Sequence, residues 1–247
     1  MPKYYGWGLP FDASVSGHVV DNLIYIVHIF MAVLFVGWLA YLLTALFKFR
    51  SRAGHKAEAH PPHSKVTSYI EAAVVIVEVI LLVGFSFPIF GAYRDKLPPK
   101  ENSLEIRVVA EQFAWNIHYP GTDGVFGKSI PKLMGPGNPL GLDPSDPAGK
   151  DDIVVINQLH IPVGKPVIAH LRSKDVIHSF FLPVMRVKQD AIPGHEVTVS
   201  FEAKPNANGK FEIACAQLCG LGHYRMRGFF FIDTPEQFDT WIKGFKK

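Results

Sequence analysis

The chain has 247 residues, of which 48% are hydrophobic, and it carries a formal net charge of +3. This length accommodates one folded domain of ordinary size together with membrane-spanning segments. The small net charge and the lack of a basic, aromatic stripe argue against nucleic-acid binding, and two cysteines are too few for a disulfide framework.

The N-terminal part is predicted to contain a short external segment and a first transmembrane helix. Residues 1–21 lack the basic start and the small-residue cleavage site of a signal peptide. Residues 22–47 are almost entirely apolar, contain no Asp, Glu, Lys or Arg, and exceed the ~20 residues that a membrane span requires. The one histidine of this helix, His28, is explained by neutral packing against a neighbouring helix.

A basic loop at 48–65 sets the expected orientation in the membrane. Glu58 is its single acid. Its Lys and Arg residues are Lys48, Arg50, Arg52, Lys56 and Lys65. Short loops rich in Lys and Arg remain on the cytoplasmic side. Both termini, and everything after the second helix, are therefore expected on the outer side of the membrane.

The second predicted span, residues 68–92, contains two carboxylates. Glu71 and Glu78 are seven residues apart, which places them two turns apart on nearly the same helix face. Ionisable groups inside a bilayer are costly and mark functional sites, although Glu71 is close enough to the boundary to snorkel. Glu78 is deeper and must be protonated, paired or exposed to water. We expect Pro88 and Gly91 to end this helix, so that a helical hairpin occupies residues 22–93.

From Leu104 onward, short β-rich runs alternate with turn residues. This pattern predicts an all-β sandwich or barrel over residues 104–247. Its candidate strands are 105–110, 112–119, 153–157, 166–173, 196–202, 210–214 and 228–233.

Two further features complete the predicted β domain. Residues 121–150 are rich in Gly and Pro, and so long a loop indicates a surface excursion against a partner. Thr234, followed by Pro235 and then Gln237, predicts a capped helix start. Apolar residues then recur at helical spacing, so an amphipathic helix is expected to close the chain.

Both cysteines lie in one segment with the spacing Cys215-x3-Cys219-x3-His223-x2-Met226, and His178 supplies a second imidazole upstream. Thiolate, imidazole and thioether are soft ligands that select copper over harder metals. Two thiolates and two imidazoles provide enough donors for two copper ions with bridging sulfurs.

Other arrangements of these residues remain open. A disulfide would close so small a loop that it would stabilise little. A zinc site usually pairs two close cysteines with two close histidines, whereas His178 and His223 lie on either side of the cysteine pair. A blue-copper site takes one cysteine, two histidines and a weak methionine, which leaves one cysteine without a role. The donor set favours dinuclear copper.

These features together resemble subunit II of the haem–copper cytochrome c oxidases, of the bacterial type, from residue 22 to the end. The resemblance rests on the two spans, the β-rich domain and three motifs: Asp175-Val-Ile-His178-Ser-Phe, Lys188-Gln-Asp190-Ala-Ile-Pro-Gly194 and the cysteine segment. It implies a membrane-anchored, cupredoxin-like domain with a dinuclear CuA centre. The implied ligands are bridging Cys215 and Cys219, capping His178 and His223, weakly bound Met226 and the backbone carbonyl of Gln217.

This sequence departs from the family pattern at two positions. The family usually has Glu where Gln217 stands, and that Glu also binds magnesium at the interface with subunit I. A neutral amide is a poorer ligand for a hard cation, which weakens the case for magnesium here. The family's electron-accepting Trp is replaced by Phe113, while Trp115 matches a later aromatic. Glu71 aligns with a glutamate at the mouth of a proton path into subunit I.

The resemblance implies an electron-accepting oxidase subunit. Electrons would pass from a c-type cytochrome, or from a membrane-bound cytochrome complex, to CuA and then to haem in subunit I, where oxygen is reduced to water with proton pumping. The chain would thus be part of an oxidoreductase and proton translocase without holding the oxygen site. Alternatives are the equivalent subunit of a CuA-containing nitric oxide reductase and a membrane-anchored copper carrier or assembly protein. The expected location is the bacterial inner membrane, with the copper domain on the periplasmic side.

Overall fold

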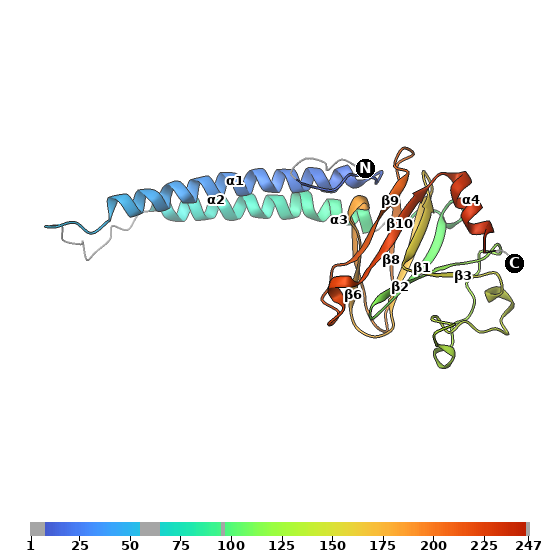
Figure 1. Cartoon of the computed structure of the whole chain (residues 1–247). Helices are drawn as coiled ribbons and strands as arrows, with labels where there is room; N and C mark the ends of the chain where they lie inside the picture. Colours follow the sequence, from blue (N-terminus) through green and yellow to red (C-terminus); the bar gives the residue numbers. More distant parts are fainter. Residues whose placement is uncertain (1–7, 55–64, 95–96, 246–247) are drawn as a thin grey trace. The chain divides into compact units, whose positions relative to one another are not determined.

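The computed structural model describes residues 8–54, 65–94 and 97–245. Within it the chain divides into two compact units (Figure 1). One unit is helical and spans residues 19–95, and the other combines residues 1–18 with residues 96–247.

The helical unit confirms two apolar helices that are long enough to cross a membrane. Helix α1 (Gly17–Lys48) begins at Gly17 rather than at residue 22. Its 32 residues rise about 48 Å, more than the ~30 Å hydrocarbon core of a bilayer. Helix α2 (Lys65–Leu81) carries the second apolar run. The predicted loop charges Lys56 and Glu58 lie outside the described residues.

The prediction that Pro88 ends the second helix is wrong. A π turn, η1 (Leu82–Ser86), follows α2 and leads directly into α3 (Phe87–Arg94), so helical structure continues through Pro88 and Gly91. Proline lacks an N–H and its ring clashes with the preceding turn of a regular helix. The wider π turn just before Pro88 accommodates both effects, and Ser86 Oγ donates a hydrogen bond to Leu81 O at 3.3 Å.

The β-rich unit is a sandwich of two five-stranded sheets, which confirms the predicted cupredoxin-like architecture. The first sheet has the order β3 (Ile153–Ile156), β2 (Ala114–Tyr119), β1 (Leu104–Glu111), β5 (Pro166–Ser173) and β8 (Val197–Glu202). The second has the order β4 (Gln158–Pro162), β10 (Arg227–Asp233), β9 (Gly209–Cys215), β6 (His178–Leu182) and β7 (Val187–Ala191). Strands β4, β6 and β7 were not predicted from the sequence.

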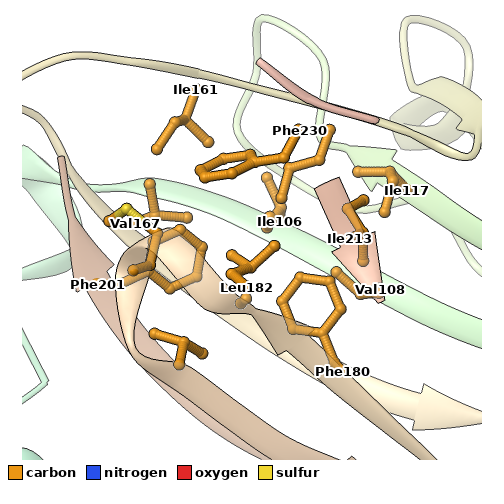
Figure 2. Packing of buried hydrophobic residues seen from close by; sticks show 14 of the residues in the cluster. Ile106, Val108, Ile117, Ile161, Val167, Phe180, Leu182, Phe201, Ile213 and Phe230 are labelled. Atoms are coloured by element: carbon orange, nitrogen blue, oxygen red, sulfur yellow. The ribbon is translucent and has the colours of Figure 1, made fainter. Parts of the chain in front are cut away.

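The core lies between the two sheets. Strand β1 alternates so that Ile106 and Val108 are buried while Glu105 and Arg107 face outward, as expected of a strand with one buried face. Figure 2 shows these side chains packed with those of the facing sheet. The cluster in that view includes Ile117, Ile161, Val167, Phe180, Leu182, Phe201, Ile213 and Phe230.

The C-terminal helix α4 (Pro235–Lys243) packs against the second sheet. Thr234 Oγ1 accepts a hydrogen bond from Gln237 N, and the Gln237 side chain accepts one from Thr234 N, which confirms the predicted capping box. Trp241 stacks on His160 at 4.1 Å between ring centroids, and Phe231 stacks on the same histidine at 4.2 Å. These contacts fix the helix on the β sandwich.

A segment before α1 is part of the β-rich unit. This N-terminal strap, residues 8–16, pairs with the chain just beyond β8 through the Ser14–Ala203 bridge. Ala13 N donates to Val184 O at 2.8 Å, and Lys204 Nζ lies 2.7 Å from Asp12 Oδ2. The strap therefore belongs to the folded β domain, although the sequence only suggested an external segment.

Candidate metal centre

The two cysteines are positioned by the connection between β9 and β10. Cys215 is the last residue of β9, Met226 immediately precedes β10, and Cys215 N donates to Met226 O at 3.3 Å across the base of the connection. We call residues 216–226 the cysteine loop. A 3-10 turn, His223–Arg225, shapes its second half. The ladder of β9 and β10 thus brings sequence-distant parts of the loop to one point.

The sulfur and imidazole nitrogen atoms of these residues lie close enough together to bind the same metal ions. Cys215 Sγ and Cys219 Sγ are 3.8 Å apart, whereas a disulfide bond measures about 2.05 Å. Each sulfur faces its own imidazole: Cys215 Sγ is 4.0 Å from His178 Nδ1, and Cys219 Sγ is 3.6 Å from His223 Nδ1. Met226 Sδ lies 3.6 Å from Cys219 Sγ.

His178 begins β6 and is fully buried. Its Nε2 lies 2.9 Å from Asp175 Oδ1, so Nδ1 is the nitrogen that is left to face Cys215. Burial alone disfavours the charged carboxylate of Asp175, but hydrogen bonds from His178, Gln112 N and Val176 N outweigh it and hold the pKa of Asp175 below its usual value. A carboxylate that fixes the outer nitrogen of a histidine is a common feature of metal sites.

The backbone of Gln217 also reaches the site. Its carbonyl oxygen lies 3.2 Å from Cys215 Sγ, while its side chain is in an exposed part of the cysteine loop. The structure therefore brings together all six residues that the sequence singled out as ligands: His178, Cys215, Gln217, Cys219, His223 and Met226.

This donor set fits copper. His178, Cys215 and Cys219 offer ligand atoms within 4.8 Å of one another, and a thioether supplements them. Thiolate and thioether donors suit copper better than magnesium or calcium. Cys219, Met226 and His178 are all buried, so water has little access. Burial, reinforced by the neighbouring Cys215, raises the pKa of the Cys219 thiol to about 11. A metal ion must therefore displace a proton to bind.

Phe113 lies against the cysteine loop rather than apart from it. A Cβ atom at Gly222 would overlap the Phe113 ring, and one at Gly220 would come within 3.2 Å of it. Gln112, beside it in the β1–β2 turn, donates from Nε2 to Cys219 O at 2.6 Å and from its backbone N to Asp175 Oδ2 at 2.7 Å. No local pattern in the sequence indicates the role of Gln112, because its partners lie 63 and 107 residues away.

Trp115 occupies the interior behind His178. It is fully buried, and its ring makes edge contacts with His178 at 6.2 Å and with Phe180 at 5.5 Å between centroids. Of the two aromatics predicted to carry electrons, Phe113 is therefore the one near the surface.

The predicted proton-uptake residue Glu71 lies on α2 in the helical unit, as does Glu78.

A groove of about 430 Å³ adjoins the β1–β2 turn. It is lined by Glu111 and Lys174, which form an ion pair at 2.6 Å, and by the Gly/Pro-rich excursion. The lining residues from that excursion and from β3 are Met134, Gly135, Pro136, Pro139 and Ile156. The long loop thus reaches the end of the sandwich at which the cysteines lie.

Comparisons with known proteins show which family this chain resembles. The family model for the periplasmic domain of cytochrome c oxidase subunit II matches residues 104–229. The alternative cytochrome c oxidase subunit 2 of Bradyrhizobium diazoefficiens is 30% identical over 225 residues, covering 91% of this chain and 79% of that protein. The cytochrome c oxidase subunit 2 of Thermostichus vulcanus is 31% identical over 259 residues, covering 94% and 77%. The crystal structure of the periplasmic domain of subunit II of cytochrome oxidase from Bradyrhizobium japonicum gives a TM-score of 0.44 at 29% identity, over 61% of this chain and 97% of that one.

Proposed function

Because the chain belongs to the cytochrome c oxidase subunit II family, we propose that it accepts electrons for a bacterial haem–copper oxidase at a dinuclear CuA centre. One observation carries this proposal: two cysteine sulfurs lie 3.8 Å apart, and each has its own imidazole nitrogen within 4.0 Å. A mononuclear site would leave one of these sulfur–imidazole pairs without a metal.

Each ligand has a distinct proposed role. Cys215 and Cys219 would supply the thiolate ligands of the copper pair, and His178 and His223 would supply its imidazole ligands. Met226 and the carbonyl of Gln217 would add weaker ligands, since Met226 Sδ is near Cys219 and Gln217 O is near Cys215. A copper pair held in this way would supply one-electron redox chemistry.

The protein holds these ligands so that little moves when an electron arrives. Strands β6 and β9 are paired at Phe180 and Cys215, and β9 is paired with β10 along its length, so three ligand-bearing segments share one sheet. Asp175 fixes the orientation of His178 through a 2.9 Å contact. Burial of Cys219 and Met226 keeps water away from the sulfurs, which tunes the potential of a metal site.

Electrons are proposed to arrive through Phe113, because its ring packs against the backbone of the cysteine loop. The buried Trp115 supports His178 from behind. The donor is a c-type cytochrome, either soluble or part of a membrane-bound complex. Subunit I receives the electrons at its haem and reduces oxygen with proton pumping.

The chain is proposed to lie in the bacterial inner membrane with its β domain on the periplasmic side. Two helices long enough to span a membrane support the anchoring. Lys48 ends α1, and Arg50 and Arg52 follow it; cations of this kind remain on the cytoplasmic side.

Glu71 is proposed to take up protons on their way into subunit I. It stands in the second turn of α2, within the apolar segment, where an ionisable side chain is costly and therefore functional by default. The Glu71→Gln variant is expected to lower turnover and proton pumping of the assembled oxidase without changing its copper content. Unchanged turnover and pumping would refute this role, and Glu101→Gln, in the exposed turn before β1, serves as the matched control.

The copper assignment is tested by metal analysis and electron paramagnetic resonance of the whole chain loaded with copper. The whole chain is required because the strap is part of the β domain. We expect two coppers for each chain that share one unpaired electron. One copper with a mononuclear signal, or bound zinc alone, would exclude the CuA centre and favour a copper carrier. Oxygen consumption compared with nitric oxide consumption by the assembled complex separates an oxidase from a nitric oxide reductase.

A further inference from the structure

Residues 217–222, which we call the loop apex, carry Cys219 away from the strands that flank the cysteine loop. Both ends of the loop are fixed by backbone hydrogen bonds, to β6 and within the β9–β10 ladder. In the part of the chain that the structure describes, one hydrogen bond joins the apex to a residue outside positions 215–226. Gln112 Nε2 donates it to Cys219 O at 2.6 Å. The position of Cys219 therefore depends on Gln112.

Gly220 allows the Gln112 amide to approach the apex. A Cβ atom at Gly220 would come within 2.7 Å of Gln112 Nε2. The backbone of Gly220 also has φ 132°, a conformation that residues with a side chain rarely adopt. The glycine directly after Cys219 thus serves two purposes: it turns the chain, and it leaves space for the amide that binds the Cys219 carbonyl.

The backbone of Gln112 reaches the other side of the metal centre. Its N–H donates to Asp175 Oδ2 at 2.7 Å, and Asp175 Oδ1 lies 2.9 Å from His178 Nε2. Gln112 directly follows β1, which belongs to the first sheet, whereas His178 and the cysteine loop belong to the second. One residue of the first sheet therefore connects the supports of Cys219 and of His178.

We infer that Gln112 is a positioning residue that fixes Cys219 relative to His178. It acts through the Cys219 carbonyl and through Asp175. The Cys219 sulfur lies 3.8 Å from the neighbouring thiol, 3.6 Å from an imidazole nitrogen and 3.6 Å from a thioether. A shift of the Cys219 backbone would change all three distances together. The part of this inference that concerns copper rests on the proposed function, whereas the part that concerns the position of the thiol does not.

The first experiment uses the copper-free, full-length protein in detergent. Gln112→Met keeps the length of the side chain but has no hydrogen-bond donor, and Gln112→Lys keeps a donor. Gln158→Met, at an exposed position at the start of β4, is the matched control. Limited alkylation of Cys219 is measured by mass spectrometry, with Cys215 in β9 as the internal reference.

We expect Cys219 to react about tenfold faster in Gln112→Met than in the native protein, because loss of one hydrogen bond permits local opening of about that extent. Cys219 is 3% exposed, so its thiol reacts only when the apex moves. The reactivity of Cys215 should be unchanged. Gln112→Lys and Gln158→Met should both react at nearly the native rate.

The second experiment uses the same full-length proteins loaded with copper. Competition with a chelator is expected to show about tenfold weaker copper binding in Gln112→Met, as for other residues that support metal ligands. The hyperfine pattern of its paramagnetic signal and its reduction potential should also differ from those of Gln158→Met. Gln112→Lys should restore the native affinity and hyperfine pattern. Its potential is not compared, because the added charge changes the potential directly.

Three results would overturn the inference. The first is equal alkylation of Cys219 in Gln112→Met and Gln158→Met. The second is identical behaviour of Gln112→Lys and Gln112→Met, because the donor would then have no effect. The third is an equal rise in the reactivity of both cysteines, which would indicate general loosening of the fold. A native protein that binds one copper or only zinc would refute the proposed function, while the alkylation rates would still decide the role of Gln112.

Discussion

At the scale of single residues, one carboxylate decides which nitrogen of His178 faces the cysteines. Asp175 engages Nε2 at 2.9 Å and also accepts a hydrogen bond from Gln112 N at 2.7 Å. Nδ1 is consequently directed toward Cys215 Sγ. Asp175 thus connects the proposed ligand to the turn that carries Phe113.

Removing this carboxylate should weaken copper binding in a graded manner. Loss of such a supporting contact costs about 10- to 100-fold in metal affinity. We expect Asp175→Asn to lose about 10-fold in copper affinity, because an amide oxygen still accepts the hydrogen bond. Asp175→Ala is expected to lose about 100-fold. Competition with a copper chelator measures the affinity, and Asp239→Asn on the exposed face of α4 is the control. Unchanged affinity in the alanine variant would contradict the supporting role.

The contact between Gly222 and Phe113 gives a second prediction at this scale. An added methyl group at Gly222 would overlap the Phe113 ring, and overpacking of this kind costs about 1–3 kcal/mol. We expect Gly222→Ala to lower the free energy of unfolding by that amount and to slow copper reduction while the copper signal persists. Gly137→Ala is the control, since an added Cβ there meets nothing within 4 Å. Equal stability of the two variants would contradict the packing described for Phe113.

The proposed ligand residues have a recognisable pattern in the sequence, whereas the residues that support them do not. The spacing of Cys215, Cys219, His223 and Met226 is local, so one short segment contains the chemical signal. Gln112 and Gly222 acquire their roles only when the β1–β2 turn meets the cysteine loop. That meeting depends on sheet packing and leaves no periodicity in the chain.

At the scale of elements, the excursion at residues 121–150 is fastened by one buried contact between a histidine and a carboxylate. Asp152 Oδ2 lies 2.6 Å from His118 Nε2 and accepts a hydrogen bond from Gly127 N at 2.8 Å, and Asp152 Oδ1 accepts one from Gly121 N at 3.3 Å. The side chains of His118 and Asp152 are almost completely buried. Phe126 covers the histidine, with 4.9 Å between ring centroids. The base of a Gly/Pro-rich loop therefore has a fixed structure.

This pair predicts acid sensitivity. Burial lowers the pKa of His118; Asp152 opposes this shift, and the charge of Arg107 adds to it. An unfolded histidine titrates near pH ~6.5. The stability associated with neutral His118 is therefore complete above that pH and is lost as the pH falls toward the folded-state pKa, by about 1.4 kcal/mol for each unit of difference.

We expect the protection of the amides at residues 121–127 against hydrogen exchange, corrected for the intrinsic exchange rate at each pH, to fall between pH 7 and pH 5 in the native protein. The His118→Gln variant should show a smaller change with pH, because glutamine does not titrate. His195→Gln, at an exposed position, should retain the native pH dependence. The same acid response in His118→Gln and in the native chain would refute this assignment.

Two of the missed strands, β6 and β7, lack a local signal in the sequence. Strand β6 is a short run, His178-Ser-Phe-Phe-Leu182, with no alternation of polar and apolar residues, because four of its five residues are buried. Strand β7 begins after Arg186, which adopts a left-handed conformation at φ 57°. Both are stabilised by pairing with each other and, for β6, with β9. Helix α4 was predicted correctly because its cap and its apolar spacing are local signals.

At the scale of the whole molecule, the N-terminal strap ties the start of the chain to the β domain. Asp12 is buried, and its carboxylate receives Lys204 Nζ at 2.7 Å and Ser14 N at 3.0 Å. The Arg186 guanidinium also donates to Pro10 O at 2.8 Å. These contacts could not be predicted from the sequence, because the strap contains no repeated pattern.

Weakening the strap should destabilise the β domain. We expect Asp12→Ala to lower the free energy of unfolding by about 1–2 kcal/mol, because both hydrogen bonds to the carboxylate are lost. Asp12→Asn should cost less than about 1 kcal/mol, since the amide oxygen can still accept from Ser14 N and Lys204 is partly exposed. Chemical denaturation of the β domain in detergent-solubilised full-length protein measures the difference. Equal loss in the two variants would contradict the role of the Ser14 hydrogen bond.

The strap also constrains how the protein is made. Its contacts join residues separated by 176 and 192 positions, so they form only after both apolar helices and strands β1 to β8 have been synthesised. Pairings so distant in sequence form slowly. A chain that inserted its first helix the wrong way round would leave residues 8–16 on the opposite side of the bilayer from Ala203 and Lys204. Its β domain would then lack these contacts, and the completed fold would be reached only by chains with the correct membrane topology.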